Sequence, residues 1–318
     1  MLTSVLLATY NSDWDKTRRT LYSIISQKKT IFELIVCDDG SCSNNFERIE
    51  LYLNENNFKN YSLIANKKNQ GTIKNILSGL AVAKGKYIKP ISPGDFFYKE
   101  DSLYEIEQFA EKSKCSACFG RAVYYSLEGE NITTHAELCN PRDFRPFIHK
   151  SSIEIKKSLL LCGNYILGAS LFYKKDDFIE ALIFSQQKMR FCEDIAATFY
   201  MAAKNKKINF AYLSSSDSKK ECIPFIWYEQ GIGISTANNG NFLRQIHENE
   251  KLFIYMVKKC MIPKIYFIAK FSKNPLTKKI VKNILMPIKY IHDKFKIPFY
   301  KIVPMKYDVQ YLFQLLHK

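Results

Sequence analysis

KYIKPISPGDFFY, residues Lys86 to Tyr98, is the stretch of sequence that decides the expected fold. Its first half is rich in β-branched and aromatic residues, which favours a buried strand. The run stops at a Ser-Pro-Gly turn and places one carboxylate, Asp95, just beyond the strand. Open α/β sheets bind their ligands at the carboxyl ends of their strands. Asp95 is therefore a candidate metal ligand, and the alternative is a turn residue that hydrogen-bonds its own backbone.

Strands and helices alternate on both sides of this stretch. Upstream, we expect strands at 4–10, 32–37 and 61–65, and helices ending near Gln27, over 45–53 and over 72–83. Downstream, we expect helices at 101–112, 178–184 and 193–203, strands at 117–125 and 208–213, an apolar segment at 159–173 and a polar loop at 129–150. Such alternation implies βαβ units, and the expected fold class is α/β with a mostly parallel sheet flanked by helices.

Positive charge is concentrated at the end of the chain. The 318 residues carry a net charge of +16, and 47% of them are hydrophobic, enough for a sizeable core. Residues 251–318 hold fifteen lysines and two aspartates, which is +13 of that total. We therefore expect one large domain over residues 1–245 and a basic, aromatic-rich helical region over residues 246–318.

The nine cysteines are interpreted as free thiols of a reducing cytosol, because no secretory leader is recognised. Cys115 and Cys118 form a CxxC pair, but no second pair follows at zinc-ribbon spacing. No apolar run approaches the ~20 residues that cross a bilayer. A soluble or peripheral protein is expected.

Five segments in order carry a resemblance to a known family. They are SVLLATYN at 4–11, ELIVCDDGS at 33–41, NQGT at 69–72, GKYIKPISPGD at 85–95 and CED at 192–194. With them, the chain resembles a family-2 glycosyltransferase of the GT-A fold over about its first 215 residues. WYEQGIGIST, residues 227–236, resembles a stretch that follows the catalytic domain in transferases of bacterial surface polysaccharides.

The resemblance implies a UDP-sugar donor bound by the first half of the catalytic domain, residues 1–125, and an acceptor bound by residues 126–245. Asp39 would accept a hydrogen bond from the uracil ring, while its neighbour Asp38 takes the alternative role of capping the following helix. The other residues of the implied nucleotide-sugar site are Thr9, Tyr10, Asn11, Gly71, Asn75, Ser92, Pro93 and Gly94. A purely structural turn remains the alternative at Gly71.

The same resemblance implies that Asp95 binds Mg²⁺ or Mn²⁺, which would bridge the diphosphate of the donor. Here the sequence departs from the usual acidic triplet, because Ser92 and Gly94 stand where carboxylates often lie. That departure leaves metal affinity and the choice of metal open. One carboxylate with phosphate oxygens and water can still complete the shell of a hard cation.

Asp194 falls at the position of the family's general base for inverting transfer, and Glu193 is the neighbour expected to position the acceptor. The alternative is that both acids only favour the N-terminal dipole of a helix. Trp227 and Tyr228 are candidates for stacking on the acceptor sugar, or else core aromatics. Gly231 and Gly233 would let this segment act as a lid.

The basic tail is expected to seat the protein on an anionic membrane surface, because lysines alternate with aromatic and aliphatic residues there. The alternative is that its helices pack on the catalytic domain. The function that follows is inverting transfer of a hexose or N-acetylhexosamine from a UDP-sugar to a lipid-diphosphate-linked glycan, at the inner face of the plasma membrane. Other readings are a catalytically weak or inactive GT-A protein, or a nucleic-acid-binding protein that uses the tail; no nucleic-acid partner is expected.

Overall fold

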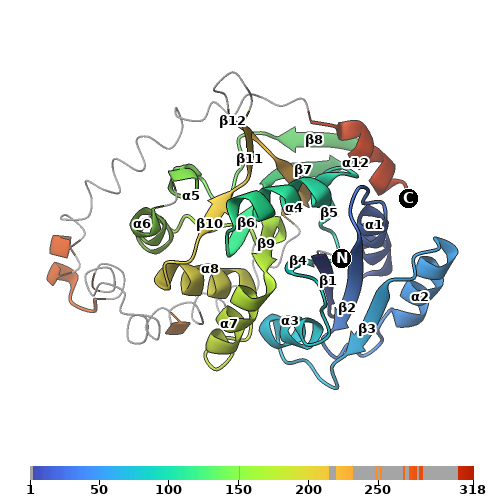
Figure 1. Cartoon of the computed structure of the whole chain (residues 1–318), viewed down its shortest axis with the longest axis horizontal. Helices are drawn as coiled ribbons and strands as arrows, with labels where there is room; N and C mark the ends of the chain where they lie inside the picture. Colours follow the sequence, from blue (N-terminus) through green and yellow to red (C-terminus); the bar gives the residue numbers. More distant parts are fainter. Residues whose placement is uncertain are drawn as a thin grey trace.

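The structure is a computed structural model that describes residues 3–149, 151–214, 220–231 and 307–318, with residues 248, 251–252, 268, 272–277 and 279–281. Its largest element is a seven-stranded sheet in the order β10-β6-β9-β4-β1-β2-β3. The bounds are β1 Thr3–Thr9, β2 Phe32–Asp38, β3 Tyr61–Ala65, β4 Tyr87–Ile91, β6 Ala117–Phe119, β9 Leu171–Lys174 and β10 Ile208–Phe210. Figure 1 shows the strands at the centre of the molecule with helices around them.

The sheet is mostly parallel, as expected from the alternation of strands and helices. β1 pairs with β2 and β4 in parallel, β2 with β3, and β6 with β10. β9 is antiparallel to both of its neighbours, β4 and β6. Since β9 runs the opposite way, its first residue lies at the edge where the parallel strands end.

Helices cover both faces of the sheet, because side chains of a strand point alternately to its two sides. Leu6 of β1 packs with α3 Thr72–Leu80, α7 Lys175–Ser185 and α8 Glu193–Ala203, in a cluster that also holds residues of α5 and α6. Val5 and Leu7 pack with α1 Trp14–Ile25, α2 Phe46–Glu55 and α4 Ser102–Ser113. The expected α/β fold, a mostly parallel sheet flanked by helices, is confirmed.

The expected strand over residues 117–125 is divided at Gly120. A Cβ at Gly120 would lie 2.4 Å from the Cβ of Phe225, so the backbone can approach there only without a side chain. Beyond this point the chain enters a second sheet in the order β5-β13-β7-β8, whose bounds are β5 Phe96–Phe97, β13 Pro224–Glu229, β7 Arg121–Glu128 and β8 Asn131–His135. A small pair, β11 Tyr212–Ser214 and β12 Lys220–Cys222, completes the strands.

The prediction of a polar loop over residues 129–150 is wrong in part. This segment contains β8, whose five residues pair with β7 in antiparallel register, and the short helix α5 Arg145–His149. The apolar segment that follows is divided between α6 Ser152–Cys162, the 3₁₀ turn η1 Gly168–Ser170 and β9. Gly163 ends α6 in the left-handed conformation, which explains the break.

The last described helix packs on the second sheet. The helix α12 Val309–Leu316 buries Leu312, Leu315 and Leu316 against Trp227 and Tyr98 of the second sheet region. Figure 1 shows α12 beside α1, next to the C-terminus. Packing on the catalytic domain, one of the two alternatives for the tail, therefore holds for its final helix.

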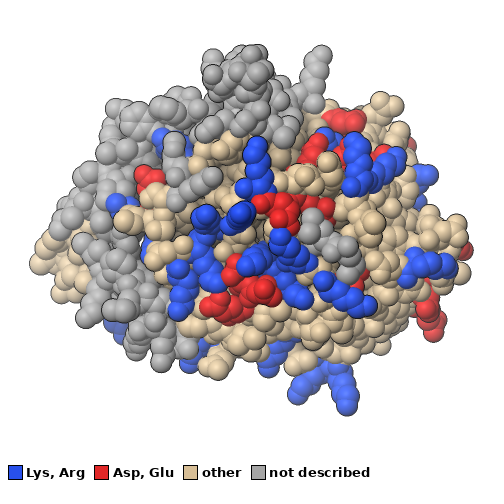
Figure 2. Space-filling view, viewed as in Figure 1, with Lys and Arg blue, Asp and Glu red and all other residues tan. Residues whose placement is uncertain are grey.

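Most of the basic tail lies outside the described residues, as does Gly233. In the part that is described, no helix is both long and apolar enough to span a membrane. Figure 2 shows Lys and Arg side chains mixed with Asp and Glu at the centre of the face in view. Ion pairs among the described residues include Lys86 with Glu111 and Lys206 with Asp177.

Candidate active site

The carboxyl ends of three adjacent strands bring the candidate donor residues together. In the order β4-β1-β2, Thr9 of β1 lies opposite Asp38 of β2, and Leu7 of β1 lies opposite Ile91 of β4. Asp39 follows β2 directly, and Asp95 follows β4 after one turn. Both acids therefore lie at the same edge of the sheet.

Asp194 reaches this edge from the other half of the domain. It is the second residue of α8, and its carboxylate lies against Gly168 of η1, the turn that leads into β9. Because β9 is antiparallel to β4, η1 lies beside the carboxyl end of β4. The fold thus places Asp39, Asp95 and Asp194 at one edge of the sheet, and their gathering about one cleft stays a prediction.

Asp38 has a structural role. Its carboxylate accepts hydrogen bonds from the backbone N–H and hydroxyl of Ser41, at 2.8 and 2.6 Å, and from the hydroxyl of Thr9 at 3.1 Å. The residue is buried and shapes the turn after β2. The helix-capping role expected for it is wrong in detail, because α2 begins at Phe46, after Asn45.

Asp39 holds the next turn along the chain. Its Oδ1 accepts hydrogen bonds from the backbone N–H of Gln70 and the amide of Asn66, and its Oδ2 accepts one from the N–H of Gly71. A carboxylate offers about four acceptor positions, so three donors leave one position for a ligand. The uracil-binding role of Asp39 remains a prediction that this geometry permits.

Tyr10 and Asn11 form the loop after β1. Tyr10 is 50% exposed, so its ring is accessible to a nucleobase. Asn11 has a positive φ of 45° and is held by Ser41, whose hydroxyl accepts its N–H at 2.7 Å. Its side-chain oxygen in turn accepts the N–H of Cys42. This loop is fixed to the one after β2.

Gly71 packs against the segment that precedes α8. Its φ is 92°, and a Cβ would lie 2.5 Å from the carbonyl oxygen of Arg190, so only glycine fits. That oxygen also accepts the N–H of Ile73, while the guanidinium of Arg190 donates to Asn69. The turn at residues 69–71 therefore fixes the segment that precedes Asp194.

Asn75 has a structural role in place of the nucleotide-sugar contact expected for it. It is 3% exposed, its amide donates to the carbonyl oxygen of Cys37, and its oxygen accepts a hydrogen bond from Asn66. These contacts connect α3 to β2 beneath the site. The structure gives Asn75 this internal role in place of the ligand contact that we expected.

Lys89 lies under Asp95 and was missed by the sequence reasoning. It is fully buried in β4, and its ammonium donates to the carbonyl oxygens of Pro90 and Ala169 and lies 5.1 Å from the ring centre of Phe225. Burial lowers the pKa of Lys89 and the charge of Asp95 opposes this, while burial raises the pKa of Asp95 and Lys89 opposes that. A lysine within a buried strand is the signal that could have revealed this pair.

A polar stripe on α1 holds the loop that carries Asp95. The hydroxyl of Thr20 accepts the N–H of Gly94 at 2.9 Å and donates to the carbonyl oxygen of Asp95 at 3.1 Å. Ser23, one turn further, accepts the N–H of Phe97. The spacing of three places both hydroxyls on one helix face, and both residues are fully buried.

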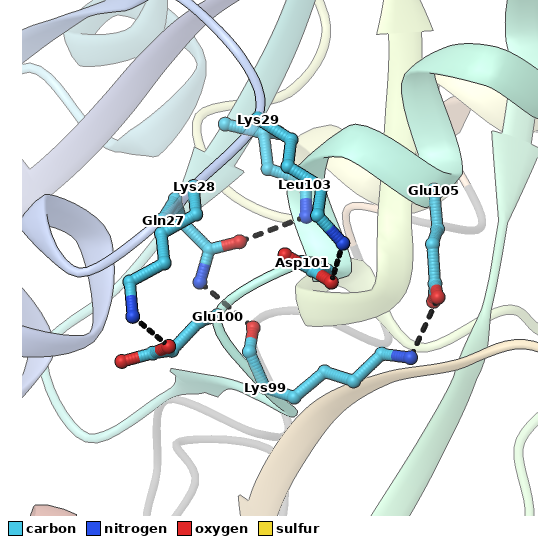
Figure 3. Close-up of polar contacts among 8 residues, drawn as sticks. All are labelled: Gln27, Lys28, Lys29, Lys99, Glu100, Asp101, Leu103 and Glu105. Carbon is cyan, nitrogen blue, oxygen red and sulfur yellow. Dashed lines mark hydrogen bonds and ion pairs between the residues drawn. The ribbon is translucent and has the colours of Figure 1, made fainter.

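Gln27, just past the end of α1, makes further contacts with this part of the chain, which Figure 3 shows. The Gln27 amide donates to the carbonyl oxygen of Lys99, and its oxygen accepts the N–H of Leu103 at 2.8 Å. Ion pairs of Lys28 with Glu100 and of Lys29 with Asp101 reinforce the contact. The whole segment from Asp95 to the start of α4 is thus anchored to α1.

Asp95 is the one carboxylate that the resemblance assigns to a metal ion. Among the described residues, no group of three or more His, Cys, Asp or Glu side chains could hold a metal ion. Ser92 is exposed and Gly94 has no side chain, so neither replaces the missing carboxylates. Mg²⁺ and Mn²⁺ fit this donor set only with phosphate oxygens of a ligand to complete the shell.

Asp194 has the environment of a general base. Burial raises its pKa to about 7, with a further rise from Glu193, and the backbone N–H groups of Ile195, Asp194 and Gly168 oppose the rise. The bond from the Ile195 N–H is 2.8 Å long. A carboxylate with a pKa near neutrality is suited to accept a proton. Glu193, the first residue of α8, is partly exposed beside it.

Of the two alternatives for Trp227, sugar stacking or a place in the core, the structure supports the core. Its indole is fully buried, stacks on Tyr98 with ring centres 5.0 Å apart, and donates its N–H to the carbonyl oxygen of Tyr98 at 3.0 Å. It is a core aromatic and offers no ring face to a sugar. Tyr228 is partly buried, and its ring packs edge-on against Tyr124.

The sequence of residues 4–175, more than half of the chain, matches the pattern of a known family, described as glycosyl transferase family 2. The chain belongs to that family. A relative of this glycosyltransferase is an uncharacterized glycosyltransferase of Haemophilus influenzae, which is 22% identical over 323 residues and covers 92% of both chains.

Solved structures share the fold of this glycosyltransferase. S. aureus TarS matches with a TM-score of 0.56 and 17% identity. The match covers 93% of this chain and 44% of the TarS chain. TarS 1–349 in complex with UDP-GlcNAc matches with a TM-score of 0.57 and 17% identity, over 93% and 73% of the two chains. The mannosyltransferase PcManGT of Pyrobaculum calidifontis, in complex with GDP-Man and Mn²⁺, has a TM-score of 0.54 and 12% identity, over 99% and 85%. The expected GT-A fold is confirmed.

Proposed function

We propose that this glycosyltransferase transfers a hexose or N-acetylhexosamine, with inversion, from a UDP-sugar to a hydroxyl group of a lipid-linked glycan of a bacterial surface polysaccharide. The observation that carries the proposal is that Asp39, Asp95 and Asp194 lie at one edge of the sheet. One acid then serves the nucleobase, one the diphosphate and one the acceptor. A structure with these acids on separate surfaces would not support a single bound donor.

Asp194 is the proposed base. Its carboxylate takes the proton of the acceptor hydroxyl while that oxygen forms a bond to the anomeric carbon and the bond from that carbon to the UDP oxygen breaks. The electron pair of the broken bond leaves with UDP. A single base without a nucleophile partner favours inversion of the anomeric centre. Glu193 stands beside the base, where it can hold a second hydroxyl of the acceptor.

Asp95 is the residue proposed to hold Mg²⁺ or Mn²⁺ together with the donor. A divalent cation there would stabilise the charge that grows on the departing diphosphate. Lys89 lies beside Asp95 and interacts electrostatically with its carboxylate, although burial lowers the pKa of the lysine. The PcManGT complex with Mn²⁺ supports metal use within this fold.

UDP is favoured as the nucleotide for two reasons. Asp39 retains one acceptor position, which suits the single ring N–H of uracil, and TarS 1–349 forms a complex with UDP-GlcNAc. The GDP-Man complex of PcManGT makes GDP-sugars the competing class. Ser92, Pro93 and Gly94 line the loop that carries Asp95, where the diphosphate would lie.

The acceptor and the place of reaction are proposed from the tail. Fifteen lysines in residues 251–318 suit an anionic membrane surface, and a lipid-diphosphate acceptor is found at such a surface. The proposed location is therefore the inner face of the plasma membrane, with the protein bound peripherally. Binding to vesicles with and without anionic lipid, at two salt concentrations, tests this part separately.

Titration of the purified protein with UDP and with GDP, each with Mn²⁺, with Mg²⁺ and with a chelator, tests the donor site. We expect UDP to bind with metal and GDP to bind at least tenfold more weakly. Nucleotide binding without transfer from any UDP-sugar would favour the inactive GT-A alternative. Salt-sensitive RNA binding without nucleotide binding would favour the nucleic-acid alternative.

A further inference from the structure

The turn η1, residues Gly168–Ser170, lies between the two carboxylates at the catalytic edge. It contacts β4 and α8 as well as the second sheet. On one side, the carbonyl oxygen of Ala169 accepts a hydrogen bond from the buried Lys89 ammonium, which also interacts with Asp95. On the other side, the backbone of Gly168 lies directly against the carboxylate of Asp194. One short segment therefore contacts both halves of the site.

Gly168 leaves no space between its backbone and Asp194. A Cβ at this position would lie 2.8 Å from Oδ2, 3.1 Å from the Cβ and 3.2 Å from the Cγ of Asp194. Real Cβ atoms do not approach other heavy atoms within 3.0 Å, so the Asp194 side chain would have to move. The φ of Gly168 is not positive, so the requirement for glycine here comes from this contact and not from the backbone conformation.

Asp194 has little freedom to yield. Its Oδ1 is already held by the N–H of Ile195 at 2.8 Å, and it has one carbon between the backbone and the carboxyl group. The turn cannot easily retreat, because the Ala169 carbonyl is bonded to Lys89, and Ser170 is fully buried with its hydroxyl donating to the carbonyl oxygen of Leu167. A side chain at residue 168 would thus displace the carboxylate itself.

We propose that Gly168 is a positioning residue for the reaction: its bare backbone sets the Asp194 carboxylate at a fixed place relative to Asp95, and the anchor of the turn is Lys89. The inference rests on the proposed function for its catalytic consequence, because it takes Asp194 as the base. The contact between Gly168 and Asp194 is independent of that function. Gly168 does not touch the substrate and acts through Asp194.

A double-mutant cycle of Gly168→Ala and Asp194→Ala, measured by thermal unfolding, tests the contact without any substrate. We expect Gly168→Ala to lower the melting temperature of the wild type and to lower it less in the Asp194→Ala background, which lacks the atoms at 2.8 and 3.2 Å and keeps only the Cβ at 3.1 Å. If Gly168→Ala does not fold alone, recovery of folding in the double variant supports the contact. Equal losses in both backgrounds, or failure to fold in both, would overturn it.

Kinetics then test the positioning role. We expect Gly168→Ala to lower kcat about 100-fold, the usual effect of a misplacement near 1 Å, with less than a twofold change in the Kd of UDP. Unchanged kcat in a folded Gly168→Ala variant would overturn the proposal. If the wild type transfers no sugar, the proposed function fails, whereas the unfolding cycle still decides whether Gly168 fixes Asp194.

Discussion

Asp39 and Gly71 are joined by a hydrogen bond of 2.8 Å from the backbone N–H of Gly71 to Oδ2 of Asp39. The bond connects the end of β2 to the turn before α3, and Oδ1 of the same carboxylate accepts the neighbouring N–H of Gln70 at 2.9 Å. Gly71 in turn packs on the carbonyl of Arg190, four residues before Asp194. A buried carboxylate therefore links the donor loop to the segment that carries the proposed base.

Asp39→Asn should lower both stability and UDP affinity. The amide can replace one oxygen as an acceptor, but its NH₂ group would face backbone N–H groups, so a buried donor loses its partner. We expect the free energy of unfolding to fall by about 1–3 kcal/mol in a urea titration. Asp13→Asn is the matched control, because Asp13 caps α1 and asparagine caps helices equally well. Equal stability of the Asp39→Asn and Asp13→Asn variants would contradict the role of Asp39.

Thr20→Val should loosen the loop that carries Asp95. Valine has nearly the same shape but lacks the hydroxyl that contacts Gly94 and Asp95. We expect weaker metal-dependent UDP binding and a loss of about 1–3 kcal/mol in unfolding free energy, because the Gly94 N–H loses its acceptor. Thr20→Ser keeps the hydroxyl and should retain most of the binding. Calorimetric titration of both variants checks this, and an equal loss in the valine and serine variants would refute it.

The raised pKa of Asp194 predicts how stability depends on pH. The folded pKa of about 7 exceeds the ordinary value of 3.8, so the folded state binds the proton more tightly than the unfolded chain. The free energy of unfolding should then fall as the pH rises from about 4 to about 7. Asp194→Asn lacks this titration, so it should be more stable than wild type at pH 8, with the gap closing by pH 4. If the free energies of unfolding of the wild type and Asp194→Asn changed in parallel with pH, the raised pKa of Asp194 would be contradicted.

The transfer rate should respond to the same group. A base must be deprotonated, so we expect kcat to fall as the pH drops below about 7. Glu193 contributes to the raised pKa, so Glu193→Gln should move the pH midpoint of kcat to lower values. An unmoved midpoint in a variant that still transfers sugar would mean that another group titrates.

Leu315→Ala should show that the end of the chain is part of the catalytic domain. Leu315 is fully buried against the cluster that holds Trp227, whereas Phe313 on the same helix is 45% exposed. We expect Leu315→Ala to lower the free energy of unfolding by about 2–5 kcal/mol and Phe313→Ala to change it little. Thermal unfolding of the two variants checks the contrast. If both substitutions lowered the free energy of unfolding by similarly small amounts, α12 would not be part of the core.

Much of the sheet could be predicted because its strands are buried on both faces and read as continuous apolar runs. The parallel order followed from the alternation of strands and helices, and the strand ends located Asp39 and Asp95. The break at Gly120 could not be predicted, because it depends on the close approach of Phe225, about one hundred residues further on. Local sequence does not report such contacts.

The roles of Asn75 and Trp227 could not be predicted for a related reason. An amide or indole near a site can bind a ligand or satisfy the backbone, and only its partners distinguish the two. Asn75 has Cys37 as its partner and Trp227 has Tyr98, which are both remote in sequence. Lys89 was visible as a charge within an apolar strand, but its contact with Ala169 required the antiparallel placement of β9.

The most direct test of the central claim measures UDP-sugar binding and sugar transfer together for Asp95→Asn and Asp194→Asn, with Ser92→Ala as the control. The account predicts that Asp95→Asn loses metal-dependent donor binding, that Asp194→Asn keeps donor binding and loses transfer, and that Ser92→Ala changes both by less than Asp95→Asn does. Transfer at the wild-type rate by the Asp95 or the Asp194 variant would contradict the assignment of that residue, and by both would contradict the account.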